Sequence, residues 1–258
     1  MTLEDRRKRE LETRRESVIN AASRLFYLKG YESVTVDDIA REAEISKTTM
    51  YSYFKDKESL FFIIVNRGIK IFKGMIEKEI QRQQAPGINS KVIKTASSQF
   101  LIEYPNYVRA YLYFRSGKFD LLNVNCINPD AKEVLEITKE LFNQVILEKE
   151  KGNENGTLKS DMNPVVMTAF NILVCEGVLN GIMNVDILLK EILDDNGITM
   201  QQFQTEAVKL MQRLIISEDN VGYKVNFTSN IVALAIVTNF MFGAIMALNF
   251  CLCESVCL

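Results

Sequence analysis

The stretch "ISKTTMYSYFKDKESL", Ile45 to Leu60, combines hydroxyl groups, lysines and aromatic rings in one short segment. Ser46 is a favourable N-cap residue, and Met50 and Phe54 stand four residues apart, so a helix beginning at Lys47 places both on one face. The other side chains of that helix are polar and project away from this face: Thr48, Thr49, Tyr51 and Ser52. The segment therefore predicts a short helix that is buried along one side and exposes hydroxyl groups along the other.

Two further helices are predicted just upstream of this segment. The stretch "SVINAASRLFYLK" places apolar residues at helical spacing and is followed by Gly30, a plausible helix stop. Thr35 and Asp38 have the spacing of a capping box and open a second helix. The tight turn 43–45 then joins the second helix to the third. Two short helices joined by a three-residue turn, the second with a polar outer face, predict a helix-turn-helix.

The composition argues against several classes of protein. The chain has 258 residues, with 31 lysines and arginines against 33 acidic residues, so positive charge is local and not general. Histidine is missing from the sequence, which removes the usual general base and the commonest metal ligand. No P-loop and no glycine fingerprint after a strand is found. We therefore expect no catalytic residues, no metal site and no cofactor. The positive charge gathers near the N-terminus at Arg6, Arg7, Lys8, Arg9, Arg14 and Arg15.

Helical periodicity continues through nearly all of the remaining sequence. Pro86-Gly87 closes a long helix that begins near Lys57. Asn128-Pro129 and Asn163-Pro164 each supply a cap residue followed by proline at the first helical position. Thr199 and Gln202 form another capping box. Strand-like alternation is missing, so we predict an all-α protein of about nine or ten helices, with a loop over 150–161 and a C-terminal tail.

The stretch "TVDDIAREAEISKTTMYSYFKDKESLF", residues 35–61, resembles the DNA-binding domain of the TetR family of bacterial transcriptional regulators, over roughly residues 12–67. The resemblance implies an N-terminal helix-turn-helix DNA-binding domain over 12–72 and a larger helical effector-binding and dimerisation domain over 73–217. It also implies a homodimer that binds a palindromic operator on double-stranded DNA. The expected function is a ligand-responsive repressor that a small-molecule effector releases from DNA, and no enzyme activity is expected.

The same resemblance assigns roles to the residues of the helix-turn-helix. By position, Thr35 and Val36 would touch the DNA backbone. The third helix, 47–53, would enter the major groove, where lysine donates to guanine acceptors and threonine bonds a base or touches a thymine methyl. The expected DNA-contacting residues are Thr35, Val36, Ser46, Lys47, Thr48, Thr49, Tyr51, Tyr53 and Lys57. The family usually has glycine where this chain has Glu44, which costs steric energy if the backbone there is left-handed.

Aromatic and methionine residues in the second domain are candidates for an effector pocket. Such side chains suit an adaptable apolar cavity, although plain core packing is the favoured explanation for any single one of them. The candidates are Phe100, Tyr104, Tyr107, Tyr111, Phe114, Met167 and Phe170. The effector itself is expected to be small and apolar or amphipathic. The helices near 164–184 and 200–217 are expected to form a four-helix interface across the dimer.

The resemblance does not cover the C-terminal extension, 218–258. The run Ile231 to Leu252 carries no charge and is long enough to span a bilayer as a helix. Three interpretations compete: a membrane anchor, a helix buried in an enlarged dimer core, and an abnormal end of the reading frame. The N-terminus lacks a secretory signal pattern, so we expect a cytoplasmic, nucleoid-associated protein or one tethered to the inner face of the cell membrane by 231–252. The alternative function is a membrane-tethered signalling or interaction protein that reuses the helix-turn-helix fold.

Overall fold

The computed structural model describes residues 2–121, 128–154, 163–183 and 187–216 of the chain. The chain divides into two compact units, residues 1–219 and 220–258. The second unit lies entirely outside the described residues. The apolar run 231–252, and with it the choice between its three interpretations, therefore also lies outside them. The prediction of a loop over 150–161 is wrong for residues 150–154, because the helix before it continues to Glu154, and the rest of that loop lies outside the described residues.

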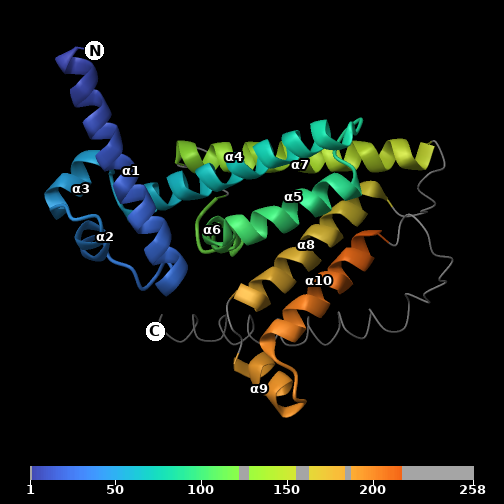
Figure 1. The fold of residues 1–258 in the computed structure, drawn as a ribbon. Coiled ribbons are helices and arrows are strands. Elements are labelled where there is room, and N and C mark those ends of the chain that lie inside the picture. Colours follow the sequence, from blue (N-terminus) through green and yellow to red (C-terminus); the bar gives the residue numbers. More distant parts are fainter. Residues whose placement is uncertain (1, 122–127, 155–162, 184–186, 217–258) are drawn as a thin grey trace, which may run out of the picture. The chain divides into compact units, whose positions relative to one another are not determined.

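The described residues form α-helices and contain no strand, which confirms the prediction of an all-α protein (Figure 1). The helices are α1 (Leu3–Lys29), α2 (Val36–Glu42), α3 (Lys47–Tyr53), α4 (Lys57–Gln83), α5 (Ser90–Glu103), α6 (Pro105–Arg115), α7 (Pro129–Glu154), α8 (Pro164–Met183), α9 (Ile187–Asp195) and α10 (Met200–Ile216).

Helix boundaries follow the cap residues in the sequence. In the capping box of α2, the Asp38 amide donates to Thr35 Oγ1 at 3.2 Å and the Thr35 amide donates to Asp38 Oδ2 at 3.0 Å. Gly30 ends α1 with a φ of 81°, a conformation that glycine adopts without steric cost. Side-chain caps also begin the later helices: Asn128 before α7, Asn163 before α8 and Thr199 before α10. Each of these predicted helix starts is confirmed.

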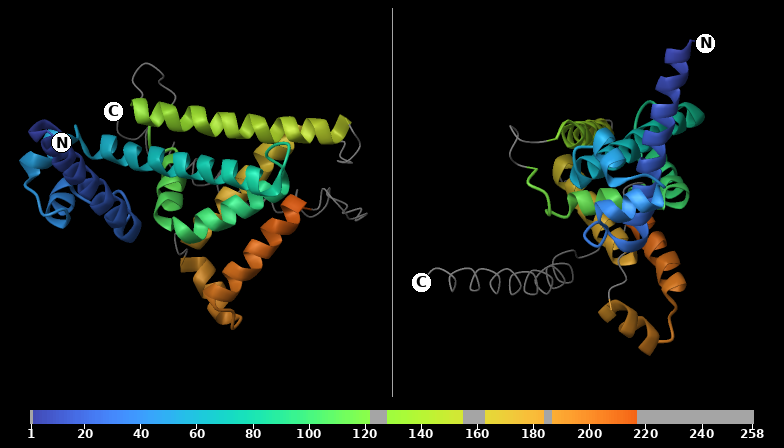
Figure 2. Two further views of the ribbon diagram at one scale, coloured as in Figure 1. Left: turned by 45° about the horizontal axis from the view of Figure 1, so that its top comes forward. Right: turned by 90° about the vertical axis from the view of Figure 1, so that its left-hand side faces the viewer.

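Helices α1, α2 and α3 pack around the first turns of α4. Val18 and Ile39 are fully buried here, as are Met50 and Leu60. These side chains come from four different helices, so their burial fixes the short helices α2 and α3, which are too short to be stable alone. The first turns of α4 thus complete the N-terminal helical domain, while the rest of α4 continues into the second part of the fold (Figure 2).

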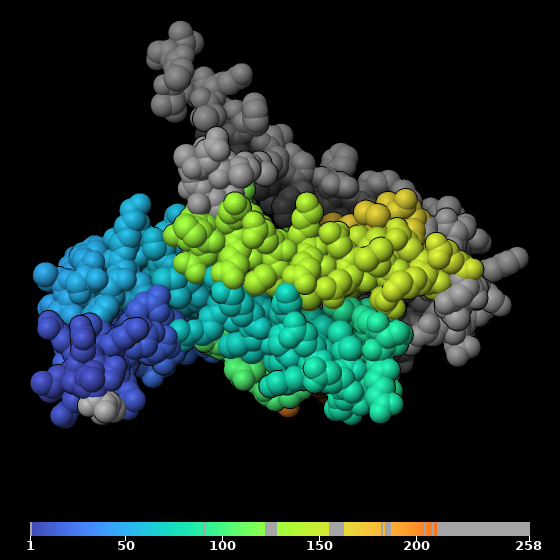
Figure 3. Space-filling view, turned by 90° about the horizontal axis from the view of Figure 1, so that it is seen from above, coloured from blue at the N-terminus to red at the C-terminus, as the bar shows by residue number. Residues whose placement is uncertain are grey.

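The second part of the fold is built around α4. Helices α5, α6 and α7 all pack against it, and α8 packs against α6, α7 and α10. Figure 3 shows α7 lying along α4 in the space-filling view. A cluster of rings fills the space where α4 and α6 approach α1: Phe26, Tyr31, Phe61, Tyr113 and Phe119. The core is therefore continuous from the N-terminal helices into the second part.

Helix α8 is apolar on its outer side as well as on its inner side. Val166, Phe170 and Leu173 are 57%, 41% and 65% exposed, and with Gly177 they follow one stripe of the helix. Among the described residues, Pro164–Gly181 is the one segment long and apolar enough to cross a membrane. The opposite side of the same helix packs against α6, α7 and α10, so α8 forms part of a folded helical layer.

Candidate nucleic-acid interface and ligand cavity

Helix α3 has a buried side and an exposed side, as the sequence predicts. Met50 is fully buried and Phe54, which ends the helix, is 3% exposed, so the two side chains fix α3 to its domain. Lys47 and Thr48 are exposed in the first turn, and the Tyr51 side chain is 48% exposed. A lysine, a threonine and a tyrosine therefore project together from one short, well-anchored helix.

Ser46 and Thr49 serve the start of α3. The Thr49 amide donates to Ser46 Oγ at 3.0 Å, and the two hydroxyl oxygens lie 2.8 Å apart. This arrangement satisfies one of the amides that a helix N-terminus leaves unpaired. Both hydroxyl groups already have hydrogen-bond partners. Thr48, the other threonine of this helix, is exposed and takes no part in the cap.

Lys47 forms an ion pair with Asp37 of α2. Its ammonium lies 2.9 Å from Asp37 Oδ1, and this hydrogen bond raises the pKa of Lys47 above its ordinary value. Both side chains are more than half exposed, and an exposed pair of this kind contributes little to stability, because water screens the attraction. Lys47 can therefore exchange Asp37 for a base or a phosphate at small energetic cost.

Three of the predicted DNA-contacting residues also make structural contacts within the protein. Thr35 is exposed, but its hydroxyl group forms the capping box of α2. Val36 and Tyr53 are half-buried and pack against the hydrophobic core. The structure thus places all three on the helix-turn-helix while giving each of them a structural contact as well.

Lys57 lies at the start of α4 and makes contacts within the protein. Its ammonium donates to the carbonyl oxygens of Tyr31 and Val34 at 3.1 and 3.0 Å and lies 4.1 Å from the centre of the Tyr31 ring. These contacts connect the start of α4 to the turn between α1 and α2. Lys57 therefore has a structural role at the start of α4, and its predicted phosphate contact stays a prediction.

The turn before α3 contains a non-glycine residue in a left-handed conformation. Glu44 has a φ of 54°, a region that side chains other than glycine and asparagine seldom adopt. The Glu44 amide donates to the Arg41 carbonyl at 3.1 Å and the Ile45 amide donates to the Ala40 carbonyl at 2.9 Å, which closes the turn. The steric cost predicted for Glu44 is therefore present.

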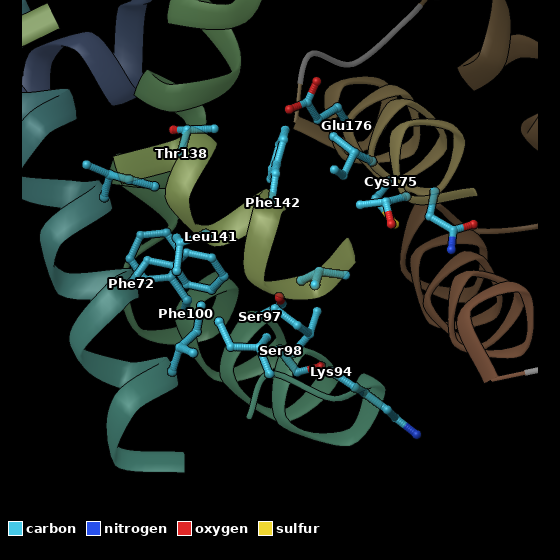
Figure 4. A pocket seen from close by; sticks show the side chains of 18 of the residues that line it. Phe72, Lys94, Ser97, Ser98, Phe100, Thr138, Leu141, Phe142, Cys175 and Glu176 are labelled. Carbon is cyan, nitrogen blue, oxygen red and sulfur yellow. The ribbon is translucent and has the colours of Figure 1, made fainter. Parts of the chain in front are cut away.

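A cavity of about 780 Å³ lies between α4, α5, α6, α7 and α8 (Figure 4). Rings and aliphatic side chains form most of its wall, among them Phe72, Phe100, Leu141 and Phe142. Cavities of this size and composition are typical of sites for small organic molecules.

The candidate pocket residues divide between the cavity, the core and the surface. Phe100, Tyr107 and Tyr111 line the cavity. Phe114 is fully buried and its ring contacts that of Phe62, so it belongs to the core. Tyr104 packs on Phe100 and Tyr107 but does not itself line the cavity. Met167 is buried and also lies outside the lining. Phe170 is exposed on the outer stripe of α8. Residue type alone did not separate these positions, because the direction of each side chain depends on how its helix packs.

Polar groups at one side of the cavity were missed by the sequence analysis. The Arg115 guanidinium lies 3.5 Å from the Glu176 carboxylate, and burial raises the pKa of Glu176. Thr138 is 5% exposed and borders the cavity beside Tyr111. These residues come from α6, α7 and α8, far apart in the sequence, so no local pattern marks them. Cys175 also lines the cavity, where burial raises the pKa of its thiol.

Lysines contribute to the cavity wall at the ends of α5 and α7. Lys91, Lys94, Lys149 and Lys151 all belong to the lining, and we call this group the lysine rim. Lys151 pairs with Glu148 at 2.8 Å, so this carboxylate balances part of the positive charge of the rim. The rim therefore favours a negatively charged group on a molecule that enters the cavity.

Helix α6 contacts both the cavity and the N-terminal helices. Tyr107 and Tyr111 line the cavity on one side of α6. On the other side, Asn106 donates to Ser23 Oγ of α1 at 2.6 Å, and the Tyr113 hydroxyl donates to the Glu32 carboxylate. A shift of α6 would therefore alter its contacts with the N-terminal domain.

A metal centre is not apparent in the part of the chain that the structure describes. No group of three or more cysteine and carboxylate side chains there is close enough to hold an ion. The candidate functional features of the described residues are an exposed polar helix, an apolar cavity and the polar residues at its borders.

These features define a class of protein: a helix-turn-helix domain joined to a helical domain with an internal cavity. The sequence model for the "Bacterial regulatory proteins, tetR family" matches residues 18–63. Over these residues, the chain contains a DNA-binding domain of the TetR family.

Known proteins extend the comparison over different parts of the chain. The HTH-type transcriptional regulator HbdR of Aromatoleum sp. (strain CIB) is 35% identical over 71 residues, which cover 28% of this chain and 31% of HbdR. The match therefore spans about a third of that relative. Among solved structures, AibR in complex with isovaleryl coenzyme A and operator DNA has a TM-score of 0.54 at 17% identity and covers 78% of this chain and 97% of its own. The fatty acid degradation regulator FadR from Bacillus halodurans has a TM-score of 0.52 at 16% identity, over 81% and 96%. At these identities the two structures show a shared fold.

Proposed function

We propose that this protein is a ligand-responsive transcriptional regulator that binds a palindromic operator as a homodimer and is released from it by a small effector. The observation that carries the proposal is the outer side of α3, where Lys47, Thr48 and Tyr51 are exposed while Met50 and Phe54 hold the helix in place. A helix of this kind enters the major groove with its first residues at the base edges.

Each exposed side chain of α3 has a distinct expected role. Lys47 and Thr48 are positioned at the start of the helix for base contacts, and the Tyr51 hydroxyl has the reach to donate to a phosphate. Release of Lys47 from Asp37 would accompany DNA binding. The basic N-terminal turns of α1 add sequence-independent attraction to the phosphates.

The cavity supports an amphipathic effector. Its wall is mostly apolar and its lysine rim is positive, which together suit a molecule with an apolar body and an anionic group. Isovaleryl coenzyme A, which AibR binds, combines these two properties. We infer that an acyl compound with an anionic head is the effector class of this chain. Because α6 contacts both the cavity and α1, effector binding would change the population of DNA-binding conformations through this helix.

The exposed stripe of α8 supports a homodimer. Three large apolar side chains on adjacent turns are exposed here, and monomeric soluble proteins rarely expose contiguous apolar surface of this kind. A second copy of the same stripe would cover it, since a two-fold interface pairs each surface with itself. Such a dimer, in the cytoplasm and associated with the nucleoid, would present two α3 helices to the two halves of a palindrome.

Selection of bound fragments from genomic DNA by the purified full-length protein tests the proposal. We expect a palindromic sequence to be enriched, with binding that weakens as salt concentration rises. Thr48→Ala should change the preferred base at one or two positions of each half-site, whereas Tyr51→Phe should weaken binding to all sequences alike. Lack of any enriched sequence, or unchanged binding by a protein that carries both substitutions, would refute the assignment of α3 as the DNA-reading helix.

A further inference from the structure

The contacts between α4 and α7 show in which direction the cavity extends. Lys70 of α4 pairs with Glu133 near the start of α7 at 2.8 Å. Beyond the end of α4, a Cβ atom at Gly87 would lie 2.5 Å from Glu148 Oε1, near the end of α7. The two helices therefore run side by side in the same direction. The cavity lies along them, and the lysine rim is at the end where both helices finish.

The wall of the cavity extends for about 15 Å in this direction. On α7 the lining begins at Thr138 and reaches Glu148, ten residues later, and a helix rises about 1.5 Å per residue. In Figure 4, Thr138 lies at one side of the cavity and Lys94 of the rim at the other, with Phe72 and Phe100 between them. Because the wall between the two ends is mostly apolar, the cavity suits an extended apolar chain that lies along α7.

Helix α6 lies across the end of the cavity that is remote from the lysine rim. Tyr111 of α6 lies beside Thr138, where the lining of α7 begins. A Cβ atom at Gly68 of α4 would lie 2.8 Å from Cβ of Tyr107, which places α6 at the same end on α4. Figure 1 shows α6 nearly end-on, whereas α4 and α7 lie across the view. Helix α6 therefore crosses the direction of the cavity.

This end of the cavity is closed. One face of α6 lines it, and most of that face is buried, since Tyr107, Val108 and Leu112 are 8%, 7% and 7% exposed. The opposite side of α6 is covered by α1, where Asn106 donates to Ser23 Oγ at 2.6 Å. At the other end, Lys91 and Lys151 of the rim are exposed. A molecule that enters at the rim therefore cannot extend beyond α6.

The distance from the rim to α6 corresponds to a chain of defined length. A C–C bond is about 1.5 Å long, so an extended alkyl chain advances roughly 1.3 Å per carbon, and about 15 Å accommodates about twelve carbons. A shorter chain with its anionic group beside Lys91 or Lys94 ends before α6, and a longer chain meets the buried face of α6. Since α6 also contacts α1, only a chain that reaches α6 can act on that contact directly.

We propose that the cavity selects its effector by length: an acyl chain of about twelve carbons extends from the lysine rim to α6, and only a chain that reaches α6 weakens operator binding. This inference rests on the proposed function for the existence of an acyl effector. It adds the length of the chain and the helix that determines this length.

Two series of acyl compounds test the proposal with the full-length protein. Saturated fatty acids with chains of six to sixteen carbons, and the coenzyme A thioesters of the same acids, are titrated by isothermal calorimetry. Affinity should rise roughly fourfold per carbon up to about twelve carbons and then fall. Fluorescence anisotropy of labelled operator DNA should show release only by chains near this length. The series that binds identifies the anionic head as the acid group itself or as a larger group.

Variants on the cavity face of α6 connect the preferred length to this helix. Leu112→Ala removes three carbons from the closed end and should move the optimum to a chain longer by about one or two carbons. Val108→Leu adds a carbon to the same face and should move the optimum to a shorter chain. Ile88→Ala is the matched control, because Ile88 is a buried lining residue at the rim end, next to Gly87, and its loss should leave the optimum unchanged. Thermal unfolding verifies that each variant is folded, and the Val108→Leu result stands by itself if Leu112→Ala is unstable.

The outcomes separate this inference from the proposed function. Three results would overturn the inference while leaving the regulator with an acyl effector: affinity that still rises at sixteen carbons, release by chains of six carbons, or an optimum that neither Leu112→Ala nor Val108→Leu moves. Binding of no acid and no thioester would overturn the inference and the acyl effector class together. Operator binding without any ligand, measured separately, would then show whether the DNA-binding part of the proposed function still holds.

Discussion

Glu44 and Gln84 are the non-glycine residues with positive φ in the described part of the chain, at 54° and 51°. A left-handed conformation costs an L-residue roughly 1–2 kcal/mol, whereas glycine adopts it freely but loses more entropy on folding. We therefore expect Glu44→Gly to stabilise the protein by about 0.5–1 kcal/mol, and Gln84→Gly to do the same. Urea denaturation measures both changes.

DNA binding should distinguish these two substitutions. Glu44 lies three residues before Lys47, the first residue of the proposed DNA-reading helix, so its removal also removes a negative charge near the phosphates. Gln84 ends α4, at the opposite end from the helix-turn-helix. Glu44→Gly should therefore tighten operator binding and Gln84→Gly should leave it unchanged. If Glu44→Gly lowers the free energy of unfolding, the Glu44 side chain must stabilise the folded protein by more than the strain of its backbone costs.

Tyr31 should make the protein sensitive to alkaline pH. Burial, with smaller contributions from Glu58, Glu32 and Asp56, raises the pKa of Tyr31 from 10.0 to about 12. The folded chain thus holds this proton more tightly than the unfolded chain does. The resulting stability is fully present below pH 10 and is lost as the pH rises towards 12.

Substitution of Tyr31 tests that dependence. Tyr31→Phe keeps the ring in its cluster with Phe61 and Phe119 but removes the ionisable group. The fall of the free energy of unfolding between pH 10 and 12 should become less steep, although the raised pKa of Tyr113 maintains part of it. Urea denaturation at several alkaline pH values measures the slope. Tyr51→Phe, at an exposed position, is the control, and an equal effect in both variants would refute the prediction.

At the scale of the element, the sequence predicts helix boundaries better than side-chain directions. Thr35, Ser46, Asn128 and Thr199 identify helix starts correctly because a cap is a local interaction between residues two or three apart. The cavity depends on how five helices pack, which no local pattern contains. Lys57 illustrates the same limit, since its ammonium binds carbonyl groups more than twenty residues earlier in the sequence.

The crossing of α4 and α6 depends on one glycine. A Cβ atom at Gly68 would lie 2.8 Å from Cβ of Tyr107, whereas a Cβ atom at Gly74 would meet nothing within 4 Å. Gly68→Ala should therefore separate the helices and destabilise the protein by about 1–3 kcal/mol. Gly74→Ala should stabilise it by up to about 1 kcal/mol, because alanine favours the helix.

The same pair of variants should differ in ligand binding. Gly68 and Tyr107 both line the cavity, so a displaced α6 would change its shape, while Gly74 lies outside the lining. Calorimetry with the best-binding fatty acid should show weaker binding by Gly68→Ala and unchanged binding by Gly74→Ala. Equal stability of the two alanine variants would show that α6 adjusts without cost and would remove the argument for a close helix crossing.

At the scale of the whole molecule, the two ends of the proposed mechanism meet in α6. Its inner side lines the cavity through Tyr107 and Tyr111. Its outer side contacts α1 through Asn106 and the turn after α1 through Tyr113. A ligand that binds one position of α6 better than another shifts the equilibrium between them by its difference in affinity. In a homodimer that shift would change the spacing of two DNA-reading helices, so regulation of this kind requires the dimer.

The proposed dimer would depend on the outer stripe of α8. Phe170 and Leu173 lie on adjacent turns near its centre and are 41% and 65% exposed. If a second copy covers them, Leu173→Glu would bury two unpaired carboxylates at the two-fold interface, which costs several kcal/mol. We expect this variant to be monomeric at micromolar concentration by light scattering and to lose tight binding to the full palindrome. Ile102→Glu, at a 78% exposed position on α5, is the matched control and should remain dimeric. If the Leu173→Glu protein remains dimeric, the interface lies elsewhere. If the wild-type protein is monomeric, the homodimer is refuted, and so is the proposal that effector binding changes the spacing of two DNA-reading helices.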